Sequence, residues 1–383
     1  MTHQKHTKLV KPDLGYFGRH EWAIMGTSCG NIQKLAKALS ESLMHQPIRK
    51  YKTAYIDADH KAGDDGDSLP HFMSFMDKIN FNRFDFQGKM SDFQFRSFFN
   101  ETDIVLINGN HFKGNRQIVV LDPKKFDSLS RKLVRLTHVE AFISLDTNLS
   151  GEDGQIPDFL KKLIPNWSEI PVFNNTEVEK ITQLLIAQSS IPPIQSLVLV
   201  GGKSTRMGRD KSQIDYHGKP QWQFMADILR GVHLDVFLSC RQEQTGLYDN
   251  ENLIVDTFTD LGPFGAILSA FRENPNTAWL VVACDLPLLT ENTIKTLMEN
   301  RNPSAIATTY RSPESAEGFP EPLITIWEPK SYAILLKFLA QGVSCPRKVL
   351  INSDTHIIDP SVPEALMNVN TPEEMGRVTS SEK

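Results

Sequence analysis

The chain has few cysteines, no long apolar run and no excess of positive charge, and each of these absences excludes a class of protein. Its four cysteines lie far apart in 383 residues and form no Cys-x-x-Cys pair, so neither a disulfide scaffold nor a zinc site is expected. No stretch approaches the roughly 18 consecutive apolar residues of a membrane-spanning helix. The net charge of −5 argues against broad nucleic-acid binding, because such binding requires a basic surface.

The rest of the composition is ordinary for a soluble globular protein, with 40% hydrophobic and 23% charged residues. The first residues carry cations but no apolar segment behind them, so a secretory signal is not expected. We therefore expect reduced thiols, a cytoplasmic location, and neither a membrane nor a nucleic-acid partner.

A chain of this length is expected to form about two domains. A helical pattern over 177–187 runs into Gln188-Ser-Ser-Ile-Pro-Pro, and consecutive prolines cannot continue a helix. The sequence therefore predicts one domain over 1–190 and a second over 191–383. Both alternate short apolar runs with helical patterns, which indicates parallel sheets with crossover helices, an α/β chain of two Rossmann-like three-layer domains. The predicted strands are 22–25, 53–56, 104–107, 118–121, 141–145, 197–200, 235–239, 280–283, 305–308 and 323–327.

The most informative segment is the run LVLVGGKSTRMGRDKSQIDYHGK over 197–219. Its apolar start predicts a buried strand that ends at Gly201-Gly202. Glycines after a strand let backbone N–H groups approach and cradle a phosphate. Arg206 adds a guanidinium fork that can grip two phosphate oxygens, and Lys211 adds a mobile positive charge. This pattern favours an enzyme that holds a nucleoside triphosphate by its phosphates.

Two carboxylates follow other apolar runs. Asp285 ends the run WLVVACD, and Pro287 then turns the chain away. Ligands of open parallel sheets bind beyond the carboxyl ends of the strands, so Asp285 would face the phosphates and is the predicted ligand of Mg²⁺. Asp256 also follows an apolar run, and a helix is expected to begin after Gly262-Pro263.

These segments resemble the motifs of the molybdenum cofactor guanylyltransferases. The glycine loop matches the pattern L-A-G-G-x-S-x-R-M-G-x-D-K nearly throughout, with Val200 in place of the usual alanine. The segment that begins at Asp256 resembles D-x-x-x-x-x-G-P-L-A-G, although Phe264 and the order of the two residues after it depart from that pattern. The family often has an asparagine where this chain has Cys240, and Ser239 is a candidate to supply the missing hydrogen bond.

Two further segments extend the resemblance. The run LMNVNTPEE over 366–374 matches the closing motif of the family, in which Asn368 and Asn370 are expected to face the ligand. Glu321-Pro322-Leu323 resembles the strand that leads to the pterin side of these enzymes. The resemblance therefore extends over most of the C-terminal half.

The resemblance implies transfer of GMP from GTP to molybdopterin, with release of pyrophosphate and with Mg²⁺ as cofactor. It assigns catalysis to Arg206, Lys211 and Asp285, and it makes Asp285 the metal ligand. Molybdoenzymes or cofactor-insertion proteins are further partners that it allows. Two alternatives stay open, another nucleotidyltransferase that uses CTP or a sugar phosphate, and a non-catalytic cofactor carrier. The nucleotide-binding residues that the resemblance implies are Val200, Gly201, Gly202, Ser204, Gly208, Ser239, Asp256, Gly262, Asn368 and Asn370.

The N-terminal half carries a degraded P-loop. A working P-loop reads G-x-x-x-x-G-K-[ST] after a strand. Here Met25 replaces the first glycine, Asn31 the lysine and Ile32 the hydroxyl residue, while Gly30 keeps the second glycine. This half resembles the GTP-binding accessory protein of the same pathway, a MobB-like domain, although Asn108 stands where that family has an acidic residue. We expect no nucleotide hydrolysis here, while a backbone anion site in the same loop stays open, because helix N-termini bind anions without a lysine.

Phenylalanine is dense between residues 72 and 99, which hold nine of them. We expect most of these rings in the core, where aromatic side chains usually lie. The alternative is that several are exposed and mark a surface for a partner or a second copy. The aspartates over 57–67 alternate with glycines and predict a solvated loop, with metal binding as the alternative.

Overall fold

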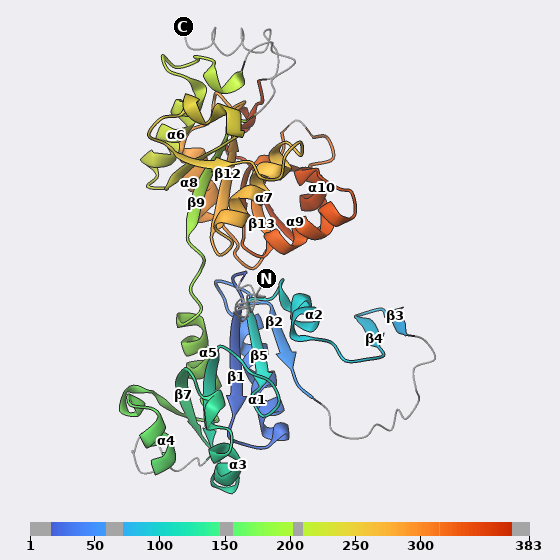
Figure 1. Cartoon of the computed structure of the whole chain (residues 1–383), viewed down its shortest axis with the longest axis vertical. Coiled ribbons are helices and arrows are strands. Elements are labelled where there is room, and N and C mark those ends of the chain that lie inside the picture. Colours follow the sequence, from blue (N-terminus) through green and yellow to red (C-terminus); the bar gives the residue numbers. More distant parts are fainter. Residues whose placement is uncertain (1–16, 59–71, 146–155, 202–209, 314, 370–383) are drawn as a thin grey trace, which may run out of the picture. The chain divides into compact units, whose positions relative to one another are not determined.

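The computed structural model describes residues 17–58, 72–145, 156–201, 210–313 and 315–369 of the chain. Contacts divide the chain into two compact units, one of Arg19–Ser189 and one that contains the described residues before and after that range. Each unit combines a mainly parallel sheet with helices (Figure 1), which confirms the predicted α/β fold class. Within the described ranges, no helix is long and apolar enough to cross a membrane.

The N-terminal unit is built on a six-stranded sheet with the order β2-β5-β1-β6-β7-β8, in which neighbouring strands run parallel. Successive side chains of a strand point to opposite faces. Ile24 accordingly packs with helices α1 and α5, whereas Met25 packs on the other face with α3 and α4. The sheet thus lies between two helical layers. The strands are β1 (His20–Met25), β2 (Thr53–Ile56), β5 (Ile104–Asn108), β6 (Arg116–Leu121), β7 (Val139–Ser144) and β8 (Val172–Asn174). The helices are α1 (Cys29–Met44), α2 (Asp92–Arg96), α3 (Phe126–Ser130), α4 (Asp158–Leu163) and α5 (Val178–Ala187).

Two short strands of this unit, β3 (Met73–Asp77) and β4 (Asn82–Phe86), form an antiparallel hairpin apart from the main sheet. The expectation that the phenylalanines of 72–99 lie mostly in the core was wrong. Those of the hairpin have no second layer to cover them, whereas Phe95 and Phe99 are partly buried against the core of the unit. None of those whose burial is described is fully buried. The exposed rings are Phe72, Phe75, Phe81, Phe84 and Phe98.

The C-terminal unit is built on a seven-stranded sheet with the order β11-β10-β9-β12-β14-β13-β15. The strands from β11 to β12 are parallel, but β14 runs antiparallel to both β12 and β13. The expectation of a wholly parallel sheet was wrong at this point. Only a short segment, 312–319, connects β13 to β14, and a connection that short joins antiparallel neighbours. The strands are β9 (Ile194–Leu199), β10 (Val236–Cys240), β11 (Asn252–Val255), β12 (Ala278–Ala283), β13 (Ala307–Arg311), β14 (Pro320–Trp327) and β15 (Thr355–Ile358).

Helices cover both faces of this second sheet. Helices α6 and α8 lie on one face of it, and α7, α9 and α10 lie on the other (Figure 1). The side chains of the first pair join one core cluster with the strands, and those of the other three join a second cluster. All ten predicted strands are present, and the structure adds β3, β4, β8, β11 and β15. The helices are α6 (Gln221–Gly231), α7 (Pro263–Glu273), α8 (Glu291–Glu299), α9 (Ser331–Ala340) and α10 (Pro346–Ile351).

The start of α7 is packed tightly against the segment that precedes it. A Cβ atom at Gly265 would lie 2.1 Å from the carbonyl oxygen of Phe258. The Ser269 hydroxyl donates to the carbonyl oxygen of Gly265 (2.8 Å) and accepts a hydrogen bond from the Thr257 amide (2.9 Å). Helix α7 therefore fixes the position of the chain that follows β11.

We expect the Gly265→Ala substitution to destabilise the C-terminal unit by more than about 2 kcal/mol, because the added methyl group would meet a backbone oxygen that cannot move aside alone. Gly246→Ala is the matched control, since a Cβ there has no neighbour within 4 Å. Thermal unfolding of the whole chain checks this expectation. Equal midpoints for the two variants would contradict the tight packing of α7.

Candidate functional site

Four parallel strands of the C-terminal unit end at the same edge of their sheet. The chain leaves β9 first, returns through β10 and β11 on one side, and then enters β12 on the other side of β9. The strand order thus reverses between β9 and β12, and ligands of open α/β sheets bind in the crevice at such a reversal. Gly201, Asp256 and Asp285 follow the ends of β9, β11 and β12 and so meet at this edge.

Asp256 is held against the start of the glycine loop. The Ser239 hydroxyl donates to Oδ1 of Asp256 (2.6 Å), and the amide of Asp256 donates to the carbonyl oxygen of Cys240 (2.9 Å). The Val200 amide donates to the carbonyl oxygen of Ser239 (3.0 Å). A Cβ atom at Gly201 would lie 3.3 Å from Oδ2 of Asp256, so the carboxylate and the loop approach closely because this residue is glycine. The structure therefore brings four of the predicted binding residues together.

Burial raises the pKa of the Asp256 carboxyl, because partial withdrawal from water disfavours its charged form. The hydrogen bond from Ser239 and the positive charge of Arg241 act in the opposite direction and lower this pKa. Because burial disfavours the charged form of Asp256, a ligand that donates further hydrogen bonds to the carboxylate would stabilise it.

The second part of the site is the pair formed by Lys211 and Asp285. The Lys211 Nζ atom lies 3.6 Å from Oδ2 of Asp285, and the side chains are 23% and 17% exposed. The Val369 amide donates to the carbonyl oxygen of Asp285 (2.8 Å), so Asn368 is one residue away from a contact with the loop after β12. Lys211, the predicted cation, and Asp285, the predicted metal ligand, are thus in contact, and both side chains are mostly buried.

Asp210 holds the turn that carries Lys211, a role that the sequence reasoning missed. Its Oδ1 atom accepts hydrogen bonds from the amide and the hydroxyl of Ser212 (3.0 and 2.8 Å), and its Oδ2 atom accepts one from Nε2 of Gln244 (3.4 Å). Asp210 therefore orients the backbone beside the lysine. An acidic residue followed by Ser two positions later is typical of such a side-chain turn and could have indicated it.

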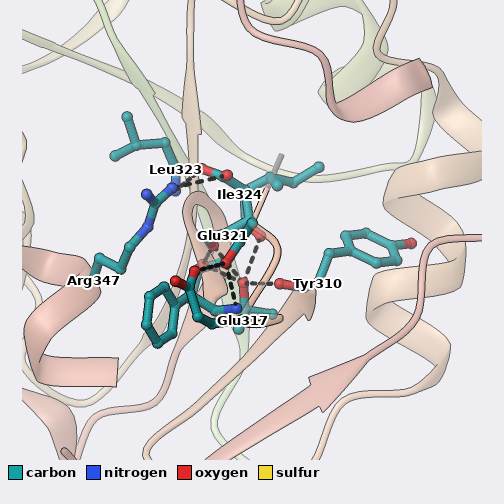
Figure 2. A network of polar contacts seen from close by, with 10 residues as sticks. Tyr310, Glu317, Glu321, Leu323, Ile324 and Arg347 are labelled. Carbon is teal, nitrogen blue, oxygen red and sulfur yellow. Dashed lines mark hydrogen bonds and ion pairs between the residues drawn. The ribbon is translucent and has the colours of Figure 1, made fainter. Parts of the chain in front are cut away.

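Glu321 is a second buried carboxylate near Asp285. It is 2% exposed, and its Oε2 atom lies 3.4 Å from Nη2 of Arg347 (Figure 2). The Leu323 amide approaches its Oε1 atom (3.4 Å), and the Thr325 hydroxyl donates to its carbonyl oxygen (2.6 Å). Burial raises the pKa of Glu321, and the charge of Asp285 adds to this, while Arg347 opposes it. The sequence singled out Glu321 through its resemblance alone, because burial and a cationic partner are not visible in the local pattern.

The donor set at Asp285 fits a magnesium ion that is shared with a bound phosphate. Mg²⁺ commonly binds one or two carboxylates together with phosphate oxygens and water. Asp285 supplies such a carboxylate beside the loop that is expected to hold the phosphates. Among the described residues, no group of three or more His, Cys, Asp or Glu side chains could hold a metal ion without such help.

Of the predicted binding residues not yet mentioned, only Gly262 is among the described residues. Gly262 lies at the N-terminus of α7 with a positive φ of 57°, which glycine adopts without strain. The remaining members of the predicted set, Gly202, Ser204, Arg206, Gly208 and Asn370, lie outside the described residues.

The corresponding loop of the N-terminal unit has polar side chains that bind one another. Asn31, at the position of the P-loop lysine, donates to the Thr27 hydroxyl (3.0 Å), which donates to Oδ2 of Asp122 (2.8 Å). Asn108 donates to Oδ1 of Asp57 (2.7 Å). Among the described residues, therefore, the neutral side chain of Asn31 stands where a nucleotide-hydrolysing P-loop has a lysine. Asn108 likewise stands where the accessory family has an acidic residue.

Comparison with known proteins agrees with the geometry of the C-terminal unit. Residues 196–356 match a family model described as a MobA-like NTP transferase domain. A molybdopterin-guanine dinucleotide biosynthesis protein A from Archaeoglobus fulgidus is a solved structure with 20% identity and a TM-score of 0.42, which covers 49% of this chain and 100% of its own.

The relatives by sequence are named for molybdenum cofactor biosynthesis or guanylyl transfer. A molybdenum cofactor biosynthesis bifunctional protein from Synechocystis is 35% identical over 213 residues, which are 55% of this chain and 60% of that protein. The chain thus spans less than two thirds of the length of that relative. A molybdenum cofactor guanylyltransferase from Pseudomonas putida is 27% identical over 49% of this chain and 97% of its own length. A probable molybdenum cofactor guanylyltransferase from Trichormus variabilis is 30% identical over 48% of this chain and 88% of its own. The chain therefore belongs to the molybdenum cofactor guanylyltransferase family and contains its MobA-like NTP transferase domain.

Proposed function

We propose that the C-terminal unit is a guanylyltransferase that transfers GMP from GTP to molybdopterin and releases pyrophosphate. The observation that carries this proposal is the contact between Lys211 and Asp285 at the point where the strand order of the sheet reverses. A cation for phosphates and a carboxylate for a metal ion lie there side by side. The names of the sequence relatives support the choice of substrates.

In this reaction a phosphate of the acceptor attacks the α-phosphorus of GTP in line, and pyrophosphate leaves. A phosphate nucleophile is already ionised at neutral pH, so no general base is needed. Catalysis then depends on positioning and on neutralising charge. Lys211 would neutralise the departing pyrophosphate together with Arg206 of the glycine loop. A Mg²⁺ ion held by Asp285 would supply a Lewis acid at the reacting phosphate.

The guanine base would lie beside Asp256. Its carboxylate is fixed by Ser239 and faces the glycine loop at Gly201. The N1–H and N2–H₂ groups of guanine are donors on one edge, and a carboxylate accepts from both. Cytosine has no such pair of donors, so this arrangement favours GTP over CTP. The acceptor would enter from the side of Glu321 and Arg347, where an exposed guanidinium can bind a phosphate.

The N-terminal unit would be a MobB-like domain without nucleotide hydrolysis, because its loop has Asn31 and Asn108 in place of charged residues. The proposal includes a cytoplasmic location, and molybdoenzymes or cofactor-insertion proteins as partners of the product.

One turnover assay with the full chain, molybdopterin, Mg²⁺ and either GTP or CTP tests this function. We expect pyrophosphate release with GTP and little with CTP. A preference for CTP or for a sugar-phosphate acceptor would show a different nucleotidyltransferase. Nucleotide or pterin binding without any release of pyrophosphate would show a non-catalytic carrier.

We expect Asp285→Asn to lower kcat by about 10²-fold or more while the fold is retained, because the amide cannot replace the charge of a metal-binding carboxylate. Asp359→Asn is the control, since Asp359 is 78% exposed and pairs with Arg311. Steady-state kinetics at several Mg²⁺ concentrations and a melting curve check this. Normal Mg²⁺-dependent turnover by Asp285→Asn would remove Asp285 from the mechanism.

We expect Lys211→Ala to reduce kcat by roughly tenfold with a smaller change in the Kd of GTP. The separate variant Arg206→Ala should reduce kcat by a larger factor. Charge builds up on pyrophosphate only as it departs, so these cations act more strongly in the transition state than on bound GTP. Lys295→Ala, which removes an exposed lysine paired with Glu291 on α8, is the control. Equal losses in kcat and in GTP affinity would indicate a ground-state role instead.

We expect Asp256→Asn to stabilise the C-terminal unit at pH 8 and to weaken GTP binding. Because the pKa of Asp256 is raised in the folded chain, the folded state holds an extra proton between the unfolded and the folded pKa. The stability of the wild-type chain therefore falls as the pH rises through this window. The asparagine variant does not lose this stability, because its side chain does not ionise. Its advantage in Tm should vanish as the pH falls and wild-type Asp256 becomes protonated. A Tm difference that is the same at all pH values would contradict this account.

A further inference from the structure

A cysteine and a histidine meet at the carboxyl edge of the N-terminal sheet, away from the site described above. Cys29 is the first residue of α1, which follows β1, and His111 follows the neighbouring strand β5. The Cys29 Sγ atom lies 3.2 Å from Nε2 of His111. Cys29 is exposed to solvent, so a nucleophile and a base are within hydrogen-bond distance at an accessible position.

The surroundings of this pair are polar and fixed. The Nδ2 atom of Asn110 lies 3.9 Å from the Cys29 sulfur and donates to the carbonyl oxygen of Thr27 (2.9 Å). The Oδ1 atom of Asn110 accepts a hydrogen bond from Nζ of Lys132 (3.3 Å). Burial lowers the pKa of Lys132, and the neighbouring Arg135 adds to this, whereas a charge on Cys29 would raise it. The positively charged Lys132 therefore contacts the same Asn110 side chain whose amide group approaches the Cys29 sulfur.

The location is also one at which α/β sheets bind ligands. The chain leaves β1 for β2 at one edge, whereas β6, β7 and β8 lie on the other side of β1, so the strand order reverses at β1. A cavity of about 390 Å³ borders the same loop, and its lining includes Thr27 and Asn31, two residues to either side of Cys29, together with Lys34. A small molecule can therefore approach this end of the sheet.

We propose that Cys29 and His111 form a nucleophile–base pair and that Cys29 is a site of reversible mixed-disulfide formation with small anionic disulfides. The anionic class follows from Lys34, Lys132 and the positive end of the dipole of the 16-residue helix α1, all of which favour negative charge. A metal ion is the weaker occupant, because among the described residues no third His, Cys, Asp or Glu side chain completes a metal-binding group there.

The step is a thiol–disulfide exchange. His111 Nε2 accepts the thiol proton, and the sulfur of Cys29 attacks one sulfur of R–S–S–R. The bond between the two sulfurs of the reagent breaks, a bond between Cys29 and one R–S group forms, and R–S⁻ leaves with the electron pair. Cys29 is oxidised and the leaving sulfur is reduced. The proton passes from His111 to R–S⁻ or to water, and a free thiol reverses the reaction.

The other three cysteines provide internal comparisons. Cys240 and Cys284 are buried, and burial raises the pKa of both thiols, that of Cys240 to about 11. Cys345 is exposed like Cys29 but precedes the short helix α10, and no contact with a histidine is found for it among the described residues. Because both thiols are exposed, a faster reaction of Cys29 than of Cys345 would thus reflect the contact of Cys29 with His111.

The experiment treats the full chain with the anionic disulfide DTNB at neutral pH, follows the released thiolate, and locates the labelled cysteines by peptide mass spectrometry. We expect Cys29 to react at least about tenfold faster than Cys345, Cys29→Ser to lose the fast phase, and His111→Gln to slow it about tenfold. His45→Gln, which replaces an exposed histidine at the other end of α1, should leave the rate unchanged. The ratio of the Cys29 rate to the Cys345 rate should be larger with DTNB than with the cationic disulfide cystamine, and this ratio cancels the different leaving-group reactivities of the two reagents.

Equal rates at Cys29 and Cys345 in the wild-type chain would overturn the proposal without recourse to any variant. So would an unchanged rate in a His111→Gln protein that melts at the wild-type temperature. A ratio of the Cys29 rate to the Cys345 rate that is as large with cystamine as with DTNB would remove the preference for anions.

Discussion

The parallel pairing of β9 with β10 on one side and with β12 on the other is the constraint on which the C-terminal site depends. This pairing places the ends of three separate chain segments at one edge of the sheet. Gly201 can then approach Asp256, and Lys211 can reach Asp285. None of these contacts is local in sequence, so any change that shifts the register of β9 would separate the groups that we propose to bind phosphate from those that we propose to bind base and metal.

The same edge of the sheet holds several carboxylates whose side chains are largely buried. Burial raises the pKa of both Asp256 and Glu321, and the charge of Asp285 raises that of Glu321 further. Among the described residues, Lys211 pairs with Asp285, Arg347 pairs with Glu321, and the charge of Arg241 lowers the pKa of Asp256, so each of these cations offsets part of the cost. A site with this balance favours a ligand that brings hydrogen-bond donors to one carboxylate and a metal ion to another. A magnesium-bound guanine nucleotide has both properties.

Hydrophobic pattern was sufficient to predict the central strands, because a run such as 197–200 is short, apolar and followed by glycines. It could not give strand direction, so the antiparallel β14 was missed; that direction follows from the length of the 312–319 connection. It also failed for the phenylalanines of 72–99, because the pattern does not tell whether a second layer covers a strand. Within the site, motif resemblance indicated Asp256 and Asp285, whereas the role of Asp210 depends on hydrogen bonds to Ser212 and Gln244 that only the folded chain makes.

The two units show how one architecture supports different chemistry. Each has a strand, a loop with glycines and a helix at a point where its strand order reverses. In the C-terminal unit the edge keeps a cation and an acid, Lys211 and Asp285, in contact. In the N-terminal unit Asn31 is bonded to Thr27, and the charged side chains near the loop include Asp122, Lys34 and Lys132. The start of a helix stabilises negative charge of any kind, on phosphate or on sulfur, even where the P-loop lysine is absent. Replacement of the phosphate ligands therefore leaves the helix terminus with a physical property that Cys29 is placed to use.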